Sequence, residues 1–301
     1  MKKVSRNSTV FHFNKNNKVA LEVEVNQPFL LEAPDAQGGK IRSNKDILYN
    51  GVDLDHVNPC VGPVYIKGAE PGDTIIIEII DIQCVSNGFI CILPNDGVLK
   101  AYTEAYTHIF SIDKNKAYFD ENIEIPLKPM IGTIGTTPIE SIPTGRSGIH
   151  GGNFDAPILR AGTKLYLPVF APGALILAGD CHAAQGDSEF SMGIEVAADI
   201  ILKVANIIKN MQVPGPFIES KDLWATIVTG DTIKEAVVGA SKNMADFLIR
   251  KLGITMSQAA VILSCVGNVR LCQTTGIDIY TSTIRMEIPK AIDRLQRLES
   301  F

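Results

Sequence analysis

Two short segments of this 301-residue chain concentrate the side chains that could carry out chemistry. They are Gly148-Ile-His-Gly-Gly-Asn-Phe-Asp155 and Gly179-Asp-Cys-His-Ala-Ala-Gln-Gly-Asp-Ser-Glu189, and each holds one of the five histidines. In the second segment Asp180 and His182 are two positions apart, so an extended backbone directs both side chains to the same face. A carboxylate and an imidazole that converge at the end of a strand suit a Zn²⁺-like ion, which in catalytic sites takes about three protein ligands and keeps one position open.

The same residues also have a purely structural interpretation. Asp and Asn side chains commonly make Asx turns, and His182 could be a hydrogen-bonded structural residue. A single segment of this kind favours that interpretation. The chain has two, and the second directly follows the apolar run 174–178, so we favour a site.

These polar segments lie in an apolar, isoleucine-rich background that must position them. Hydrophobic residues make up 46% of the chain and charged residues 20%, which excludes a disordered protein. The abundance of β-branched residues favours sheet over a helix bundle. The formal net charge of −5 gives no basic surplus, so nucleic acid and anionic membranes are poor partners. No apolar run is long enough to predict a membrane span.

Compartment and assembly are inferred from the same background. The basic N-terminus leads into the polar run 14–18 rather than an apolar one, which argues against a secretory signal. The six cysteines form no CxxC pair and lie mostly in apolar segments, so we expect buried, reduced thiols in a cytoplasmic protein. Isoleucine-rich strands with few charges lead us to expect a homo-oligomer.

Residues 8–180 read as short apolar runs broken by Gly, Pro, Asn and Asp, a pattern typical of a β-sandwich or barrel. We predict strands over 64–68 and 74–82, joined by Glu70-Pro-Gly-Asp73, which has the Pro and Gly of a type II turn. The segment 64–77 aligns without a gap with 165–178, on Pro-Gly in both. Either two hairpins are similar by chance, or two related β units pack together.

The C-terminal third has a different character. In the preceding segment, 191–211, the spacing of apolar residues fits a helix, whereas the predominance of Ile and Val fits a strand. Thr232-Ile-Lys-Glu235 and Thr255-Met-Ser-Gln258 are capping boxes that predict two helices, the first ending at Gly253, and strands follow over 269–272 and 283–288. We therefore predict a mainly β protein, a β-sandwich. A β-rich body over 1–213 carries the site, and an α+β portion over 214–301 packs on it.

The two polar segments resemble the paired motifs of the acetamidase/formamidase family. Two further elements agree: 35–40 resembles its D-x-x-GG element and 62–73 its G-P-[VI]-x-[VI]-x-G-A-E-P-G-D signature. The resemblance spans residues 8 to 290 and implies hydrolysis of short aliphatic amides on a β-sandwich with a metal-supported site. It also implies strand for 191–211. Ser188, where the family pattern has Gly, and Cys181, inside the histidine motif, are departures that leave the substrate open.

Amide hydrolysis requires a nucleophile, a polarised carbonyl and a proton for the departing ammonia. A metal, which we expect to be zinc, supplies the first two, and a carboxylate transfers the proton. Our hypothesis for the metal ligands is His150, Asp180 and His182. Glu189 is the predicted general base, and Asp155 or Asp187 orients the other groups.

Other side chains are assigned to the substrate or to a second ion. Asn153 and Gln185 can both donate and accept hydrogen bonds, so either could bind the small amide. Asp35 is a candidate for the same pocket, or, with Glu32, for a second, oxygen-ligated ion such as calcium.

Three alternatives stay open. Cys181 beside His182 could act as a thiolate nucleophile, but neighbouring residues on a strand face opposite sides, which favours a core position for Cys181. The same site could hydrolyse another small C–N bond, such as that of a lactam. The chain could also be a non-catalytic binding protein on the same scaffold.

Overall fold

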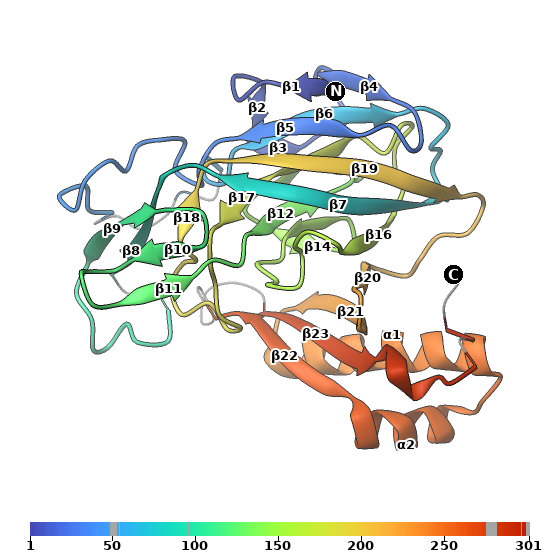
Figure 1. Cartoon of the computed structure of the whole chain (residues 1–301). Coiled ribbons are helices and arrows are strands. Elements are labelled where there is room, and N and C mark those ends of the chain that lie inside the picture. Colours follow the sequence, from blue (N-terminus) through green and yellow to red (C-terminus); the bar gives the residue numbers. More distant parts are fainter. Residues whose placement is uncertain (49–52, 54, 95–96, 275–281, 296, 299–301) are drawn as a thin grey trace.

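The computed structural model describes residues 1–301 except 49–52, 54, 95–96, 275–281, 296 and 299–301. Two large sheets form its β-rich body, and two helices lie beside the C-terminal strands of one of these sheets (Figure 1). The first sheet has nine strands, in the spatial order β1 (Lys2–Val4), β5 (Phe29–Ala33), β19 (Ala198–Ile208), β7 (Thr74–Cys84), β16 (Lys164–Pro168), β20 (Phe217–Glu219), β21 (Leu223–Gly230), β23 (Ser282–Pro289) and β22 (Asn268–Gln273).

The second sheet has twelve strands, and its centre is β17 (Ile176–His182). One edge of β17 pairs with β12 (Met130–Gly135), and its other edge pairs in succession with β6 (Cys60–Ile66) and β18 (Glu195–Val196). The outer strands are β8 (Asn87–Ile92), β9 (Tyr106–Ile112), β10 (Lys116–Tyr118) and β11 (Glu124–Pro126) beyond β18, β15 (Gly151–Asn153) and β14 (Ser147–Gly148) beyond β12, and β2 (Thr9–Val10) and β4 (Leu21–Val23) on β6; β3 (His12–Phe13) and β13 (Ile142–Pro143) pair separately.

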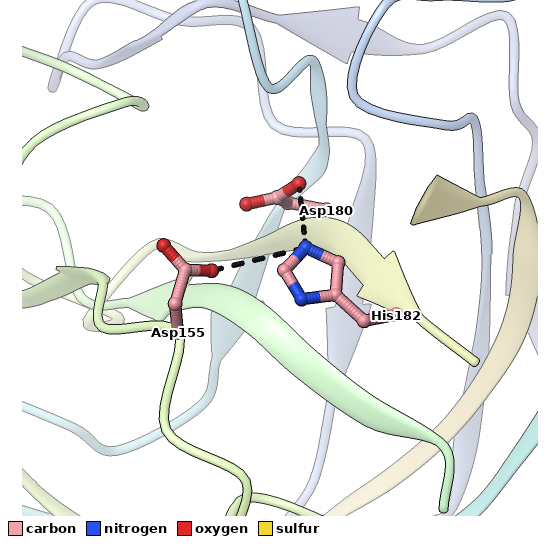
Figure 2. Close-up of side chains that lie close together, drawn as sticks. All are labelled: Asp155, Asp180 and His182. Atoms are coloured by element: carbon pink, nitrogen blue, oxygen red, sulfur yellow. Dashed lines mark ion pairs between the residues drawn. The ribbon is translucent and has the colours of Figure 1, made fainter. Parts of the chain in front are cut away.

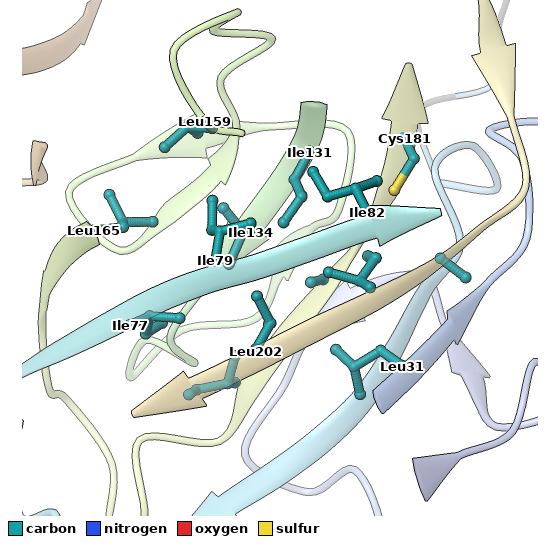
Figure 3. Packing of buried hydrophobic residues seen from close by; sticks show 14 of the residues in the cluster. Leu31, Ile77, Ile79, Ile82, Ile131, Ile134, Leu159, Leu165, Cys181 and Leu202 are labelled. Atoms are coloured by element: carbon teal, nitrogen blue, oxygen red, sulfur yellow. The ribbon is translucent and has the colours of Figure 1, made fainter. Parts of the chain in front are cut away.

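The predicted sandwich is confirmed by one core shared between the two sheets. Isoleucines of β7 in the first sheet and of β12 in the second lie in the same buried cluster (Figure 3). On β19, the side chains of Ile200, Leu202 and Val204 alternate with less buried positions, as expected for a strand with one face on a core. The ambiguous stretch 191–211 is therefore strand over most of its length, as the family resemblance implies.

The two similar Pro-Gly segments do not form hairpins, which corrects one expectation. The turn itself is type II as predicted: the Asp73 N–H donates to the Glu70 carbonyl at 3.0 Å, and Gly72 has φ +94°. However, β6 and β7 belong to different sheets, as do β16 and β17. Each turn is thus a corner at which the chain crosses the sandwich.

The two corners lie side by side, as the hypothesis of two packed β units requires. The Gly72 N–H donates to the Val169 carbonyl at 3.0 Å, and the Gly173 N–H donates to the Ala69 carbonyl at 2.7 Å. β6 pairs with β17 in the twelve-stranded sheet, and β7 pairs with β16 in the nine-stranded sheet. Each unit therefore contributes one strand to each sheet, and that strand lies next to a strand of the other unit. Because β17 has β6 on one edge and β12 on the other, its end lies at the centre of the second sheet.

The C-terminal strands extend the first sheet, because β20 pairs with β16. Helix α1 (Ile233–Leu252) packs on β21 and β23, and α2 (Met256–Val266) packs on α1; a 3₁₀ turn, η1 (Lys290–Ile292), follows β23. Both capping boxes are formed, and Gly253 ends α1 in the left-handed conformation. Neither described helix alone has the length and hydropathy of a membrane span, although α1 and α2, bent by 115° at their junction, pass such a test as a pair.

Candidate active site

Three buried side chains converge at the end of β17. Asp180 and His182 come from β17 itself, and Asp155 follows β15 (Figure 2). The Nε2 atom of His182 lies 3.5 Å from Oδ1 of Asp180 and 3.9 Å from Oδ1 of Asp155. All three residues are at most 2% exposed, so the group is closed to bulk solvent.

Two glutamates complete a second group around the same imidazole. Glu195 stands opposite His182 in the pairing of β18 with β17, and its Oε1 lies 3.1 Å from Nε2. Glu189 lies on the loop that leaves β17 and is also buried. One ligand atom each of His182, Glu189 and Glu195 lie within 4.8 Å of one another, and the same holds for Asp155, Asp180 and His182.

The polar atoms of this cluster match the requirements of a metal ion. Four of them are buried without a hydrogen-bond partner: Nε2 of His182, Oδ1 of Asp155, Oε2 of Glu189 and Oε2 of Glu195. Buried polar atoms are normally paired, because an unpaired one costs about 1–3 kcal/mol. In the described part of the chain, His182 is the only cationic partner of Asp155, Asp180 and Glu195. The cluster therefore has an excess of negative charge that a divalent cation would balance.

Two glycines leave the room that the cluster needs. A Cβ on Gly132, in β12, would lie 2.5 Å from Oδ1 of Asp155 and 2.8 Å from Oδ2 of Asp180. A Cβ on Gly193 would lie 2.4 Å from Nδ1 of His182. All three distances are far below van der Waals contact, so any larger residue at these positions would displace the site.

Gln185 fixes the orientation of the His182 ring. Its Nε2 donates to the Asp155 carbonyl at 2.7 Å and to the Cys272 carbonyl at 3.3 Å, so its Oε1 faces the imidazole. Nδ1 of His182 donates to that Oε1 at 2.5 Å. The remaining ring nitrogen, Nε2, is thus the one that can bind a metal.

Asp180 reaches the site by a different backbone than the sequence predicted. An extended residue was expected, but Asp180 has φ +55°, in the left-handed region that non-glycine residues rarely occupy. Its Oδ2 accepts hydrogen bonds from Nδ2 of Asn58 at 2.7 Å and Oγ1 of Thr133 at 3.2 Å. The same two groups donate to Oδ1 of Asn153. This network holds Asp180 in place and leaves its Oδ1 toward His182.

Burial and mutual repulsion change the protonation of the cluster. Burial raises the pKa of Asp155 to about 7, and the charge of Asp180 adds to the shift. Burial, again with repulsion from Asp180, raises the pKa of Glu195 to about 8, and burial with repulsion from Asp155 raises the pKa of Glu189 well above its usual range. Burial disfavours the charged imidazole of His182, but Glu195 and Asp180 outweigh it and hold its pKa well above the usual range. Without a cation, the cluster therefore retains protons.

Among the predicted ligands, the structure brings Asp180 and His182 together and adds Asp155 to them. His150 belongs to neither group: its ring packs edge-on against Phe13, and its Nε2 is buried without a partner. Burial lowers the pKa of His150 to about 4, so the ring is neutral near pH 7. Its role as a ligand stays a prediction.

The remaining predicted residues surround the cluster or lie apart from it. Asp187 forms an ion pair with the buried Arg285 at 2.7 Å, which ties its loop to β23. Oδ1 of Asp35 accepts two backbone hydrogen bonds within its own turn. Glu32 is paired with Lys3 at 2.8 Å. A second ion held by Asp35 and Glu32 thus has no further support.

Cys181 lies in the core, as predicted from strand alternation. It is fully buried among the isoleucines of the sandwich (Figure 3), and burial raises the pKa of its thiol. A buried thiol of raised pKa is a poor nucleophile. All six cysteines are free thiols, as expected, but Cys84 is only half-buried and Cys265 is exposed.

Sequence reasoning missed Glu195, Gln273 and Asn58. Glu195 had a local signal, since it is a single carboxylate inside the apolar run 192–196, where an unpaired charge is costly. Gln273 donates from Nε2 to Oδ2 of Asp155 at 2.6 Å, across 118 positions of sequence. Neither Gln273 nor Asn58 carries a local signal, because only the tertiary fold brings them to the site.

Comparisons with known proteins agree with the fold described above. A formamidase of Methylophilus methylotrophus is 25% identical over 285 residues, 71% of this chain and 70% of that protein. An acetamidase of Mycolicibacterium smegmatis is 23% identical over 271 residues, 65% of each chain. The chain thus spans about two thirds of the length of the curated relatives it matches. The crystal structure of an acetamidase from Bacillus halodurans superposes with a TM-score of 0.91 at 33% identity, over 96% of this chain and 98% of that one.

A more distant structure, a gamma lactamase from Delftia acidovorans, has a TM-score of 0.66 at 21% identity and supports the fold alone.

The model of the Acetamidase/Formamidase family matches residues 3–146 and 141–294, nearly the whole chain and both polar segments. The relatives that this chain matches include a formamidase and an acetamidase, which are amidase-type hydrolases. The chain therefore belongs to the acetamidase/formamidase family.

Proposed function

We propose that this protein hydrolyses short linear amides, such as formamide and acetamide, to a carboxylate and ammonia at the cluster around His182. The observation that carries the proposal is the presence of four buried ligand atoms without a hydrogen-bond partner around one imidazole, from His182, Asp155, Glu189 and Glu195. Membership of the acetamidase/formamidase family gives the class of bond. A divalent metal bound here would supply a water of lowered pKa and polarise the amide carbonyl.

The proposed ligands are Nε2 of His182 with Oδ1 of Asp155 and Oδ1 of Asp180, and Glu195 is a fourth candidate. One imidazole with carboxylate oxygens is a donor set that zinc accepts, and zinc remains the proposed ion. The oxygen-rich side of the cluster also suits a harder cation such as calcium.

Glu189 is the proposed proton carrier. Its Oε2 is buried, unpaired and within the second group, so it faces the same space as the ligands. There it would take a proton from the attacking water and return it to the amide nitrogen, so that the C–N bond breaks and ammonia leaves. Burial raises the pKa of Glu189, which makes its carboxylate a stronger base toward the attacking water.

Gln185 and Asp187 have positioning roles in this proposal. Both ends of the Gln185 amide are hydrogen-bonded within the protein, so it orients His182 instead of binding substrate. Asp187, paired with Arg285, anchors the loop that carries Glu189. Oδ1 of Asn153 accepts from Asn58 and Thr133, which leaves only its amide N–H groups to meet a substrate.

The proposal is tested by ammonia release from formamide, acetamide and propionamide, and by formation of the ring-opened amino acid from a small lactam, for the unaltered protein and for Glu189→Gln. We expect release from the linear amides, and a loss of about 10²–10⁴-fold in kcat for Glu189→Gln with its metal retained. The exposed Glu121→Gln is the matched control and should be fully active. Ring opening of the lactam without ammonia release from the linear amides, or hydrolysis of no substrate at full metal content, would overturn the proposal.

A further inference from the structure

An edge strand of the C-terminal portion forms one side of the site. β22 is the last strand of the nine-stranded sheet, and its end contacts the loop that carries Glu189. The Ser188 N–H donates to the Leu271 carbonyl at 2.7 Å. Oγ1 of Thr274 donates to the carbonyls of Ser188 at 2.6 Å and Glu189 at 3.2 Å. The site is therefore built by both portions of the chain.

Within this strand, Gln273 reaches a proposed ligand directly. Its Nε2 donates to Oδ2 of Asp155 at 2.6 Å and to the Asn153 carbonyl at 3.3 Å. Oδ2 of Asp155 is thus occupied, while Oδ1 has no hydrogen-bond partner and faces His182. The two oxygens of one carboxylate are held in different roles.

The direction of the Gln273 amide is itself fixed. Its Oε1 accepts from Oγ1 of Thr283 at 3.3 Å, and Thr283 lies within hydrogen-bond distance of the hydroxyls of Thr229, at 3.2 Å, and Ser147, at 3.3 Å. With Oε1 engaged there, the NH₂ group must face Asp155. A chain of neutral hydrogen bonds therefore runs from the C-terminal strands to the carboxylate.

We propose that Gln273 is a positioning residue that holds Asp155 so that a single oxygen, Oδ1, is presented to the metal. A neutral donor suits this task, because a Lys or Arg would compete with the cation for Asp155 and a Glu would repel it. This inference rests on the proposed function for the identity of the site, and it adds how the C-terminal portion controls the ligand.

The test compares Gln273→Leu, which keeps the size but cannot donate, with Thr283→Val, which keeps the shape but removes the hydroxyl that donates to Oε1 of Gln273 and that also contacts Thr229 and Ser147. We expect Gln273→Leu to weaken Zn²⁺ binding by about 10–100-fold in competition with a chromogenic chelator, and Thr283→Val to weaken it less. At saturating Zn²⁺, kcat for formamide should fall while KM stays unchanged. Gln212→Leu, which removes a donor to the Val169 carbonyl outside the site, is the matched control.

The double variant separates positioning from a general packing effect. If Thr283 acts through Gln273, adding Thr283→Val to Gln273→Leu causes no further loss of Zn²⁺ affinity, whereas independent structural effects would add. Unchanged Zn²⁺ affinity in a folded Gln273→Leu protein, or additive losses, would overturn the inference. Zn²⁺ binding without amide hydrolysis in the unaltered protein would overturn the proposed function alone, since the affinities still rank the variants.

Discussion

His182 donates from Nδ1 to Oε1 of Gln185, and the other end of the same amide donates to the backbone carbonyl of Asp155. One side chain thus couples the orientation of the imidazole to the segment that carries a neighbouring carboxylate. The arrangement sets the tautomer of His182, so that Nε2 is free of a proton when a cation is bound. It also links the two polar segments, which are separate in the sequence, at one point.

Gln185→Leu should therefore weaken metal binding without unfolding the protein. The ring of His182 would lose its acceptor and its fixed tautomer, and we expect a loss of about 10–100-fold in affinity for Zn²⁺. The measurement is chelator competition, with circular dichroism to confirm the fold. An affinity equal to that of the unaltered protein would show that Gln185 does not orient the ring.

Gly132→Ala should damage the site by crowding it. The added Cβ would lie 2.5 Å from Oδ1 of Asp155, so the carboxylates must move. We expect a fall of about 1–3 kcal/mol in the free energy of unfolding, together with weaker metal binding. Gly186→Ala is the matched control, because a Cβ there meets no atom within 4 Å. Equal effects of the two substitutions would contradict the described geometry.

Metal affinity should rise with pH. Burial raises the pKa of Asp155 to about 7 and that of Glu195 to about 8, so both carboxyls hold protons at lower pH and must release them to a cation. Nε2 of His182 must also release a proton, because Glu195 and Asp180 hold its pKa well above the usual range. The apparent affinity should therefore increase by about tenfold per pH unit for each proton released. Calorimetry in buffers of different ionisation enthalpy measures the release. Binding without proton release at pH 6 would contradict these pKa values.

Ser188→Gly should stabilise the protein. Ser188 has φ +91°, where a side chain is strained and glycine is not, and it occupies the position at which the family pattern has Gly. We expect an increase of about 1 kcal/mol in the free energy of unfolding in urea. Ser188→Ala, which keeps the Cβ, should give no such gain. A less stable Gly variant would mean that the Ser188 side chain compensates for the strain.

The local features of the fold were predictable because they depend on neighbours in sequence. The capping box of Thr232 and Glu235, the left-handed Gly253 and the type II turn at Gly72 all follow from residues within one turn. The crossing of that turn between sheets was not predictable in this way. It depends on the pairing of β6 with β17, which joins residues far apart in the chain.

The residues of the site divide in the same way, into those with a local signal in the sequence and those that only the tertiary fold brings there. Asp180 and His182 were identified by their spacing, and Asp155 by its motif, although its position in the cluster was not foreseen. Glu195 and Gln273 enter the site through strand pairing and a long-range hydrogen bond. Their types alone, one glutamate and one glutamine, carry no information on which side chain of the site they will contact.

The central claim is that amide hydrolysis depends on a divalent metal held at the His182 cluster. The most direct measurement is ammonia release from formamide by protein stripped with a chelator and then titrated with Zn²⁺, with bound metal quantified in parallel. Activity should be lost on stripping and return in proportion to the metal bound. Full activity in protein that contains no metal would contradict it.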